Sequence, residues 1–221
     1  YLNAAQQAGY QINNDMNGER QEGFGLMDTT IFNGKRQSTS VTYLHPIKHR
    51  SNLEILTNVT VNKILFENKK AVGVECKANG ENKKYFSSKE VLLSAGAINS
   101  PQLLMLSGIG PENELSKYSI EPVECLEGVG KNLQDHLETY VQYKCKKPVT
   151  LHSAQNPLKM ALIGAEWFLF KTGVAAHSNL ETGGFVRSNE MSDYPNIQFH
   201  FFPSLVLDHG RKSSFYHDLK L

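Results

Sequence analysis

The sequence predicts a mixed α/β protein, and three of its segments support that fold class. The first segment consists of β-rich runs in which apolar and polar residues partly alternate, with short polar breaks after the second and third runs. Such spacing is typical of strands joined by turns. The three runs are Asn52–Thr57, Val59–Phe66 and Ala71–Lys77.

The second segment is Glu90–Ser94, a nearly all-apolar run that is typical of a strand covered on both faces. It leads through Ala95-Gly96-Ala97 into an expected helix at Ser100–Leu106. Ser100 can cap this helix, and Pro101 suits the first helical position. A strand that ends in small residues before a helix lets a cofactor approach the backbone, although tight packing of strand on helix explains the same pattern.

The third segment follows a change of character near Asp135–Glu138, where glycine-punctuated loop gives way to new strands and a helix. Glu138–Cys145 alternates as a strand would, and Leu158–Phe170 is an apolar run of helical length. A domain boundary is therefore expected between residues 137 and 138. The other expected elements are helices at Leu2–Ala8 and Pro111–Tyr118 and strands at Gly183–Val186 and Ile197–Phe202.

Composition excludes several classes of protein. The chain has 221 residues, a net charge of +1 and 40% hydrophobic residues, so it has no strong attraction to nucleic acid or acidic membranes. No run of about 18 apolar residues is present, so no membrane span is expected. The three cysteines form no C-x-x-C pair, and together with the eight histidines they show no ligand spacing. Neither a disulfide framework nor a metal site is expected.

One long motif points to a family. Residues 96–110 read GAINSPQLLMLSGIG, which resembles the second signature of the glucose–methanol–choline oxidoreductases over its whole length. The resemblance extends over nearly the whole chain, and its later segments look like the choline-oxidising members rather than the sugar-oxidising ones. The other segments that carry it are Glu22–Gly25, Gly34–Arg36, Tyr43–Pro46, Gly128–Gly130, Asn132–His136, Leu151–Gln155, Glu181–Phe185, Ile197–Phe201 and Asp208–Gly210.

The resemblance implies FAD as cofactor and a particular domain arrangement. Part of a Rossmann-like FAD-binding domain, residues 30–137, is expected beside part of a substrate domain built on an antiparallel sheet, residues 138–221, with residues 1–29 as a connection to the substrate domain. In the family, the backbone of a strand valine contacts the adenine side of FAD, and Val61 resembles that residue. Ala95 and Gly96 are the next expected contacts. Without the motif, Val61 would be interpreted as a core residue.

The resemblance also implies choline as substrate. A site for its fixed positive charge needs a carboxylate and aromatic faces, and each cation–π contact is worth about 0.5–2 kcal/mol. The family pattern places Glu138 opposite the trimethylammonium group and His200 near the hydroxyl, where it would hold the alkoxide that forms. Trp167, Phe199 and Phe201 are candidates for the aromatic faces. Taken alone, these residues also fit plainer roles, as a solvated glutamate, a core histidine and core aromatics.

The chain is expected to be a central portion of such an enzyme that lacks both ends. It contains no G-x-G-x-x-G, because Asn113 stands where a third glycine would follow Gly108-Ile109-Gly110, and the family's catalytic histidine is expected beyond Leu221. The resemblance implies FAD-dependent oxidation of choline to betaine aldehyde, the first step of glycine betaine synthesis. Two alternatives stay open: a family member that acts on another primary alcohol or a sugar, and a non-catalytic fragment.

The resemblance has implications for location as well. Animal members that oxidise choline act at the mitochondrial inner membrane and pass electrons to the respiratory chain. The same location, a respiratory-chain acceptor and peripheral membrane association are therefore expected here, with no nucleic-acid partner. No targeting signal is visible in these residues.

Overall fold

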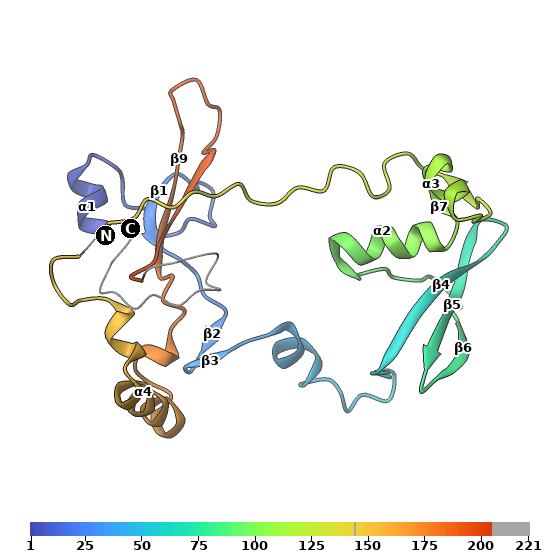
Figure 1. The fold of residues 1–221 in the computed structure, drawn as a ribbon, viewed down its shortest axis with the longest axis horizontal. Helices are drawn as coiled ribbons and strands as arrows, with labels where there is room; N and C mark the ends of the chain where they lie inside the picture. The colour runs from blue at the N-terminus through green and yellow to red at the C-terminus, as the bar shows by residue number, and fades with distance from the viewer. Residues whose placement is uncertain (144, 205–221) are drawn as a thin grey trace. The chain divides into compact units, whose positions relative to one another are not determined.

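The computed structural model describes residues 1–143 and 145–204, which form two compact units. The first unit combines Tyr1–His49 with the described residues from Glu138 onward, and the second unit is Arg50–Leu137 (Figure 1). The chain thus passes from the second unit back to the first between residues 137 and 138, whereas residues 30–49 group with the first unit. Which unit serves FAD and which serves the substrate stays a prediction.

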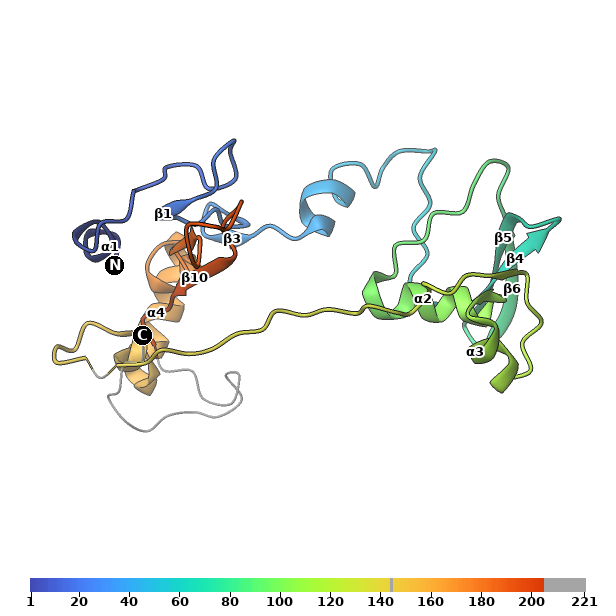
Figure 2. The same cartoon turned by 90° about the horizontal axis from the view of Figure 1, so that it is seen from above.

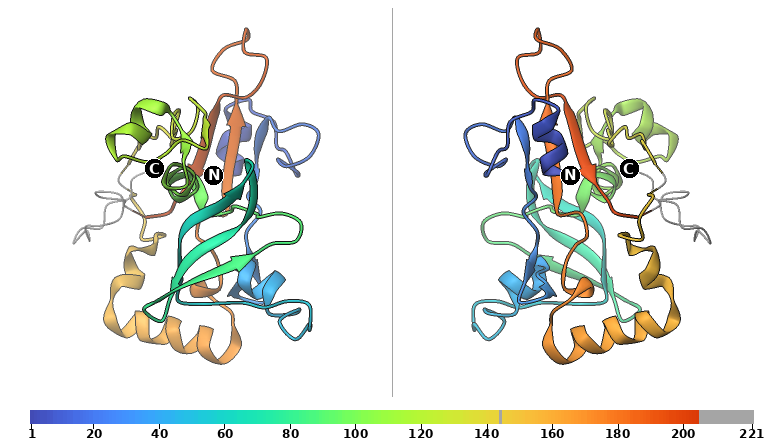
Figure 3. Two further views of the ribbon diagram at one scale, coloured as in Figure 1. Left: turned by 90° about the vertical axis from the view of Figure 1, so that its right-hand side faces the viewer. Right: turned by 90° about the vertical axis from the view of Figure 1, so that its left-hand side faces the viewer.

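The first unit is built on an antiparallel sheet whose strands lie far apart in the sequence. β1 (Gly23–Leu26) pairs with β9 (Thr182–Val186), and β9 pairs in turn with β10 (Ile197–Phe201). The short helix α1 (Leu2–Gln7) lies beside β1, as Figure 3 shows. The predicted N-terminal helix and the two predicted strands near the end of the described chain are confirmed.

The core of the first unit lies on the face of the sheet that carries Phe24. Phe24, Ala5 and Val186 are buried together, and Leu2 packs against them. The ring of Phe24 crosses β9 at Gly184, where an added Cβ would lie 2.5 Å from a ring carbon. A side chain at position 184 would therefore displace the ring, which is why glycine suits the middle of this strand.

The helix α4 (Pro157–Phe170) confirms the predicted apolar helix of the first unit. Asn156 caps it, since its side-chain oxygen accepts hydrogen bonds from the amides of Leu158 and Lys159, and Pro157 lies in the first turn. The unit also contains the hairpin β2 (Ile31–Phe32) and β3 (Lys35–Arg36), and short helical turns at Ser40–Leu44, Leu151–Gln155 and Val174–Ala176.

The second unit contains an antiparallel meander that confirms the predicted strand block. β4 (Val59–Glu67), β5 (Lys70–Ala78) and β6 (Glu81–Phe86) pair in that order (Figure 2). Two-residue turns join them at Asn68-Lys69 and Asn79-Gly80, and all four turn residues have positive φ. Turns of this kind match the twist of the strands that they connect.

Two helices and a short parallel pair complete the second unit. The helices are α2 (Gly96–Leu106) and α3 (Glu112–Lys117), and the parallel pair is β7 (Ile109–Gly110) with β8 (Glu124–Cys125). Gly108 ends α2 with a φ of +88°. The predicted short helix after Pro111 is confirmed, and α3 buries its Leu115 almost completely.

Three predicted strands are wrong in the part of the chain that the structure describes. Asn52–Thr57, Glu90–Ser94 and the described residues of Glu138–Cys145 form no strand. Their composition favours extended backbone, but a strand also needs a neighbour for its amides and carbonyls. No described strand pairs with any of the three, and Leu92, in the most apolar run, is 80% exposed.

The start of α2 also differs from its prediction. The sequence favours a start at Ser100, but the helix begins at Gly96 and contains Pro101 in its interior. The Ser100 hydroxyl accepts a hydrogen bond from the amide of Ala95 at 3.1 Å. Ser100 therefore provides a partner for an amide at the N-terminal end of α2, and it does so from inside the helix rather than from the cap position.

Candidate cofactor and substrate sites

The three predicted cofactor residues all lie in the second unit. Ala95 and Gly96 form the exposed N-terminal end of α2, whose first turn carries no acidic residue. Gly96 has a φ of +90°, and an added Cβ would meet no atom within 4 Å. Open backbone at the positive end of a helix suits an approaching phosphate, so these residues fit a dinucleotide such as FAD.

Val61, the third predicted contact, lies in β4 at an irregularity. The pairing of β4 with β5 shifts register between Val61 and Lys63, which leaves Asn62 as an extra residue. The Val61 side chain is 38% exposed, so it is not a core residue of the described chain. Bulges of this kind frequently re-aim a strand beside a binding site. The contact of Val61 with FAD stays a prediction.

The predicted substrate residues all lie in the first unit. Glu138 is exposed, and its Oε1 accepts a hydrogen bond from the hydroxyl of Tyr140. This bond raises the pKa of Tyr140 above its ordinary value, because the phenol donates to a carboxylate. Sequence reasoning missed Tyr140, although its spacing of two residues from Glu138 in an expected strand would have placed both on one face.

His200 and Phe201 are neighbours in β10 and therefore point to opposite faces of the sheet. Phe201 stacks on the ring of Tyr1 with centroids 4.8 Å apart, and Phe199 lies 5.6 Å from Phe24. His200 is exposed on the other face, where it pairs with Gly183 of β9. The structure thus does not bring His200 and Phe201 together, and both phenylalanines pack with other aromatics of the first unit.

Trp167 fastens α4 to the β2–β3 turn. Its indole Nε1 donates to the carbonyl of Gly34 at 2.7 Å, and the ammonium of Lys171 lies 4.0 Å from the ring centroid. Gly34 has a φ of +64°, and an added Cβ would lie 2.1 Å from the carbonyl oxygen of Lys171. The ring therefore has a cation and a carbonyl as partners inside the chain, while its part in a choline site stays a prediction.

Replacing Trp167 with Phe is expected to lower the free energy of unfolding by about 1 kcal/mol, because one hydrogen bond to the Gly34 carbonyl is lost. Unfolding by urea, followed by far-ultraviolet circular dichroism, measures the change. The neighbouring Phe168 is 72% exposed, and Phe168→Leu serves as the control, with an expected change of less than about 0.5 kcal/mol. Equal losses in the two variants would contradict a stabilising role for the indole N–H.

A cavity of about 390 Å³ lies next to this contact. The turn at Asn33-Gly34 and the residues Lys171–Gly173 contribute to its lining, as do His177 and Glu181, whose Nδ1 and Oε1 atoms lie 3.0 Å apart. None of Glu138, Trp167, His200 and Phe201 lines it. The cavity and the predicted substrate residues therefore do not coincide within the described chain.

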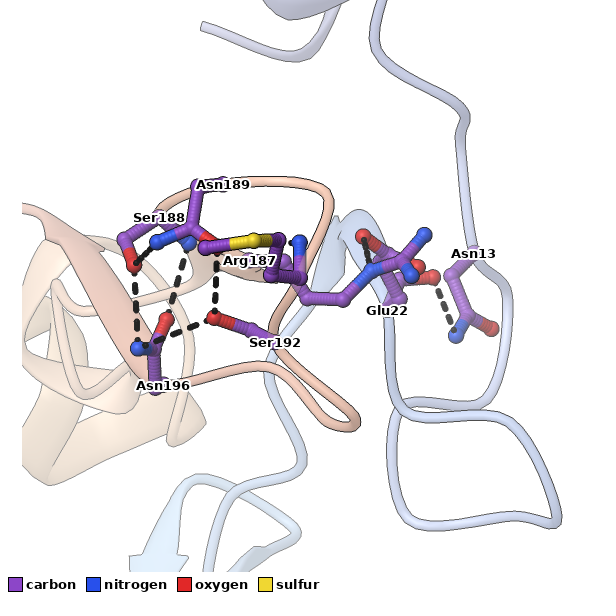
Figure 4. A network of polar contacts seen from close by, with 8 residues as sticks. Asn13, Glu22, Arg187, Ser188, Asn189, Ser192 and Asn196 are labelled. Atoms are coloured by element: carbon purple, nitrogen blue, oxygen red, sulfur yellow. Dashed lines mark hydrogen bonds and ion pairs between the residues drawn. The ribbon is translucent and has the colours of Figure 1, made fainter.

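An ion pair joins the segments next to the paired ends of β1 and β9, in the sheet that also carries His200. Arg187 Nε donates to Glu22 Oε1 at 3.0 Å, which lowers the pKa of the Glu22 carboxyl below its ordinary value (Figure 4). Asn196 closes the β9–β10 hairpin by accepting from the amide of Ser188 at 2.8 Å (Figure 4). These contacts fix the register of the sheet that carries His200.

Other kinds of site find no support among residues 1–143 and 145–204. These residues contain no cluster of three or more His, Cys, Asp or Glu side chains that could hold a metal ion. No helix among them is both long and apolar enough to cross a bilayer. Cys76, Cys125 and Cys145 are all free thiols. The Asp208–Gly210 segment of the family resemblance lies outside the described residues.

Comparisons with known proteins agree with the family resemblance. Residues 1–138 match the family model described as GMC oxidoreductase. The chain is 57% identical to "Choline dehydrogenase, mitochondrial" of Homo sapiens, over 96% of this chain and 36% of that protein. It is 51% identical to "Oxygen-dependent choline dehydrogenase" of Staphylococcus xylosus, over 96% of this chain and 38% of that protein.

A solved structure gives the same result for the fold. An FAD-dependent oxidoreductase from Chaetomium thermophilum has a TM-score of 0.75 at 29% identity, over 83% of this chain and 33% of that one. The predicted mixed α/β class is confirmed. The chain spans little more than a third of the length of the curated relatives that it matches. Because the family model covers more than half of its residues, this chain belongs to the GMC oxidoreductase family.

Proposed function

We propose that the whole protein oxidises choline to betaine aldehyde, the first step of glycine betaine synthesis, with FAD as cofactor. The observation that supports this proposal best is the similarity, over nearly the whole chain, to two proteins named as choline dehydrogenases. Those two relatives come from a mammal and a bacterium, so the likeness is not confined to one lineage.

The cofactor belongs with the second unit in this proposal. The backbone of Val61 would contact the adenine side of FAD, and Ala95 and Gly96 would approach the dinucleotide from the open end of α2. When bound, FAD supplies the redox chemistry by accepting a hydride from the α-carbon of the substrate. These residues would bind FAD and orient it.

The substrate belongs with the first unit. The Glu138 carboxylate would attract the trimethylammonium group, with Tyr140 holding the carboxylate in place. His200, exposed on one face of β10, would hold the hydroxyl oxygen of choline as negative charge develops on it. Trp167 and Phe201 remain candidate aromatic faces, although each has another partner within this chain.

We further propose that the protein works at the mitochondrial inner membrane, associates with it peripherally and passes electrons to the respiratory chain. The name of the human relative supports a mitochondrial location, while the name of the staphylococcal relative makes oxygen the competing acceptor. The two acceptors can be told apart by experiment.

The test is a turnover assay of the full-length protein with choline. We expect flavin absorbance in the purified protein, choline-dependent reduction of an artificial electron acceptor, and little oxygen consumption when that acceptor is omitted. Bound flavin without choline turnover would move the substrate to another primary alcohol or a sugar. Rapid oxygen consumption without the acceptor would contradict the respiratory-chain proposal.

The 221-residue chain on its own is expected to be inactive in the same assay. It contains no glycine-rich dinucleotide fingerprint. In this proposal the catalytic histidine is also not among its 221 residues. This inactive chain is the matched blank for the full-length assay, and turnover by it would contradict the assignment of the catalytic histidine.

A further inference from the structure

Ser107 is the most completely buried polar side chain of the described residues. It follows directly after α2, and its relative exposure is 0%. Its hydroxyl donates to the carbonyl of Leu103 at 2.6 Å and accepts from the amide of Ile64 at 2.8 Å. The first bond stays within one helical turn, but the second joins residues 43 positions apart. A buried hydroxyl with both functions in use ties two elements together.

The Ser107 hydroxyl gives the Ile64 amide the hydrogen-bond partner that a neighbouring strand would otherwise provide. β4 is at the edge of the sheet order β4-β5-β6, so alternate amides of β4 point away from β5. Ile64 pairs with Val74, and its amide donates to Ser107. Its side chain is only 4% exposed, so neither the amide nor the side chain can turn to water without disrupting the packing.

The backbone around Ser107 allows little adjustment. Gly108, the next residue, has a φ of +88°, and an added Cβ would lie 2.6 Å from the carbonyl oxygen of Glu121. The amide of Val123 donates to the Gly108 carbonyl at 2.8 Å. The chain after α2 is thus held from its other side, and the Ser107 hydroxyl has a fixed position toward β4.

We propose that Ser107 is a positioning residue of the cofactor site, an inference that rests on the proposed binding of FAD. It joins β4, which carries Val61, to α2, which begins at Gly96 and has Ala95 as its N-cap. All three predicted cofactor contacts therefore lie on these two elements or at the N-cap of the helix. Ile64 is three residues from Val61, on the far side of the register shift between Val61 and Lys63. Without the Ser107–Ile64 hydrogen bond, β4 and α2 can shift relative to each other. The distance between Val61 and the pair Ala95 and Gly96 is then no longer fixed.

The test is the affinity of the full-length protein for FAD, measured by flavin fluorescence when apoprotein is titrated with cofactor. Ser107→Ala leaves the Ile64 amide without its partner, and we expect the Kd for FAD to rise by at least about tenfold. The control is Leu115→Val in α3, a buried position of the same unit that takes no part in the hydrogen bonds of Ser107. We expect it to lower the melting temperature of the apoprotein comparably but to leave the Kd within about twofold.

A measurement on the unmutated protein covers the case in which Ser107→Ala does not fold. Hydrogen exchange at the Ile64 amide should slow when FAD binds. The Ser107–Ile64 hydrogen bond and FAD binding stabilise the same arrangement of β4 and α2, and such coupling is reciprocal. An unchanged exchange rate at Ile64 on FAD binding would overturn the inference.

The outcomes separate this inference from the proposed function. Normal FAD binding and equal Kd values for Ser107→Ala and the unmutated protein would overturn the positioning role and leave the proposed function standing. A comparable rise in Kd for Leu115→Val would also overturn it, since destabilisation alone would then explain the effect. An unmutated protein that binds no FAD would overturn the cofactor proposal and this inference with it.

Discussion

Glu138→Gln in the full-length enzyme is expected to raise the KM for choline by about 50- to 100-fold, with a much smaller change in kcat. The trimethylammonium group keeps its charge at every pH and has no N–H to donate. Its attraction to the side chain therefore comes from the carboxylate charge, which glutamine lacks. The glutamine keeps the size of the side chain and an oxygen that can accept from the Tyr140 hydroxyl, so the local structure should survive.

Steady-state kinetics with choline measure this effect, and two further variants sharpen it. Glu181→Gln removes another exposed carboxylate of the first unit, one that pairs with His177, and should leave the KM unchanged. Tyr140→Phe keeps the carboxylate but removes the hydroxyl that donates to it, so a rise of only about twofold to fivefold is expected. An unaltered KM for Glu138→Gln would remove the cation-site assignment and favour an uncharged alcohol as substrate.

Gly34→Ala is expected to lower the free energy of unfolding by at least about 3 kcal/mol. The new Cβ would lie 2.1 Å from the Lys171 carbonyl oxygen, and Gly34 has a left-handed φ of +64°. Neither backbone can retreat easily, because the Gly34 carbonyl also accepts from the indole of Trp167. The substitution should therefore separate the β2–β3 turn from the end of α4.

Trp167 is the only tryptophan in the sequence, so its emission during urea unfolding of the 221-residue chain reports on this contact directly. Gly9→Ala is the matched control, since Gly9 belongs to the same unit and has a φ of +90°, but an added Cβ there meets no atom within 4 Å. It should cost about 1 kcal/mol, the penalty of the left-handed backbone alone. Equal losses at positions 9 and 34 would show that the close approach to Lys171 does not contribute.

Elements with local signals could be predicted from the sequence. The helix at 157–170 combines a capping asparagine, a proline in the first turn and an apolar run, and the structure contains it almost as expected. The β4–β5 hairpin follows from two β-rich runs around a short polar break at Glu67–Lys70. In these cases, neighbouring residues provide the contacts that stabilise the element.

Elements that need distant partners could not be predicted in this way. Glu90–Ser94 has the composition of a buried strand, but no described strand lies beside it, and pattern alone does not show whether a partner exists. The early start of α2 depends on the Ser100 hydroxyl reaching back to Ala95, whereas a Ser-Pro pair ordinarily marks a helix start.

The candidate site was predictable in a similar, partial sense. The family motif selects Val61, Ala95 and Gly96, and the structure places them on a strand and a helix of one unit. The motif does not reveal that Ser107, which belongs to it, connects that strand to that helix by a hydrogen bond to a residue 43 positions away. Nor does it reveal that Phe201 stacks on Tyr1, because that contact joins opposite ends of the described chain.

The pairing of β1 with β9 has a consequence for the order in which the chain acquires its structure. Gly23 is opposite Phe185 in the sheet, and the whole of the second unit, Arg50–Leu137, is inserted between these two strands in the sequence. During synthesis the second unit is complete before β9 leaves the ribosome. The second unit can therefore fold while β1 is not yet paired with β9. Because the entropic cost of closing a loop grows only slowly with its length, the long insertion adds little to the cost of pairing β1 with β9.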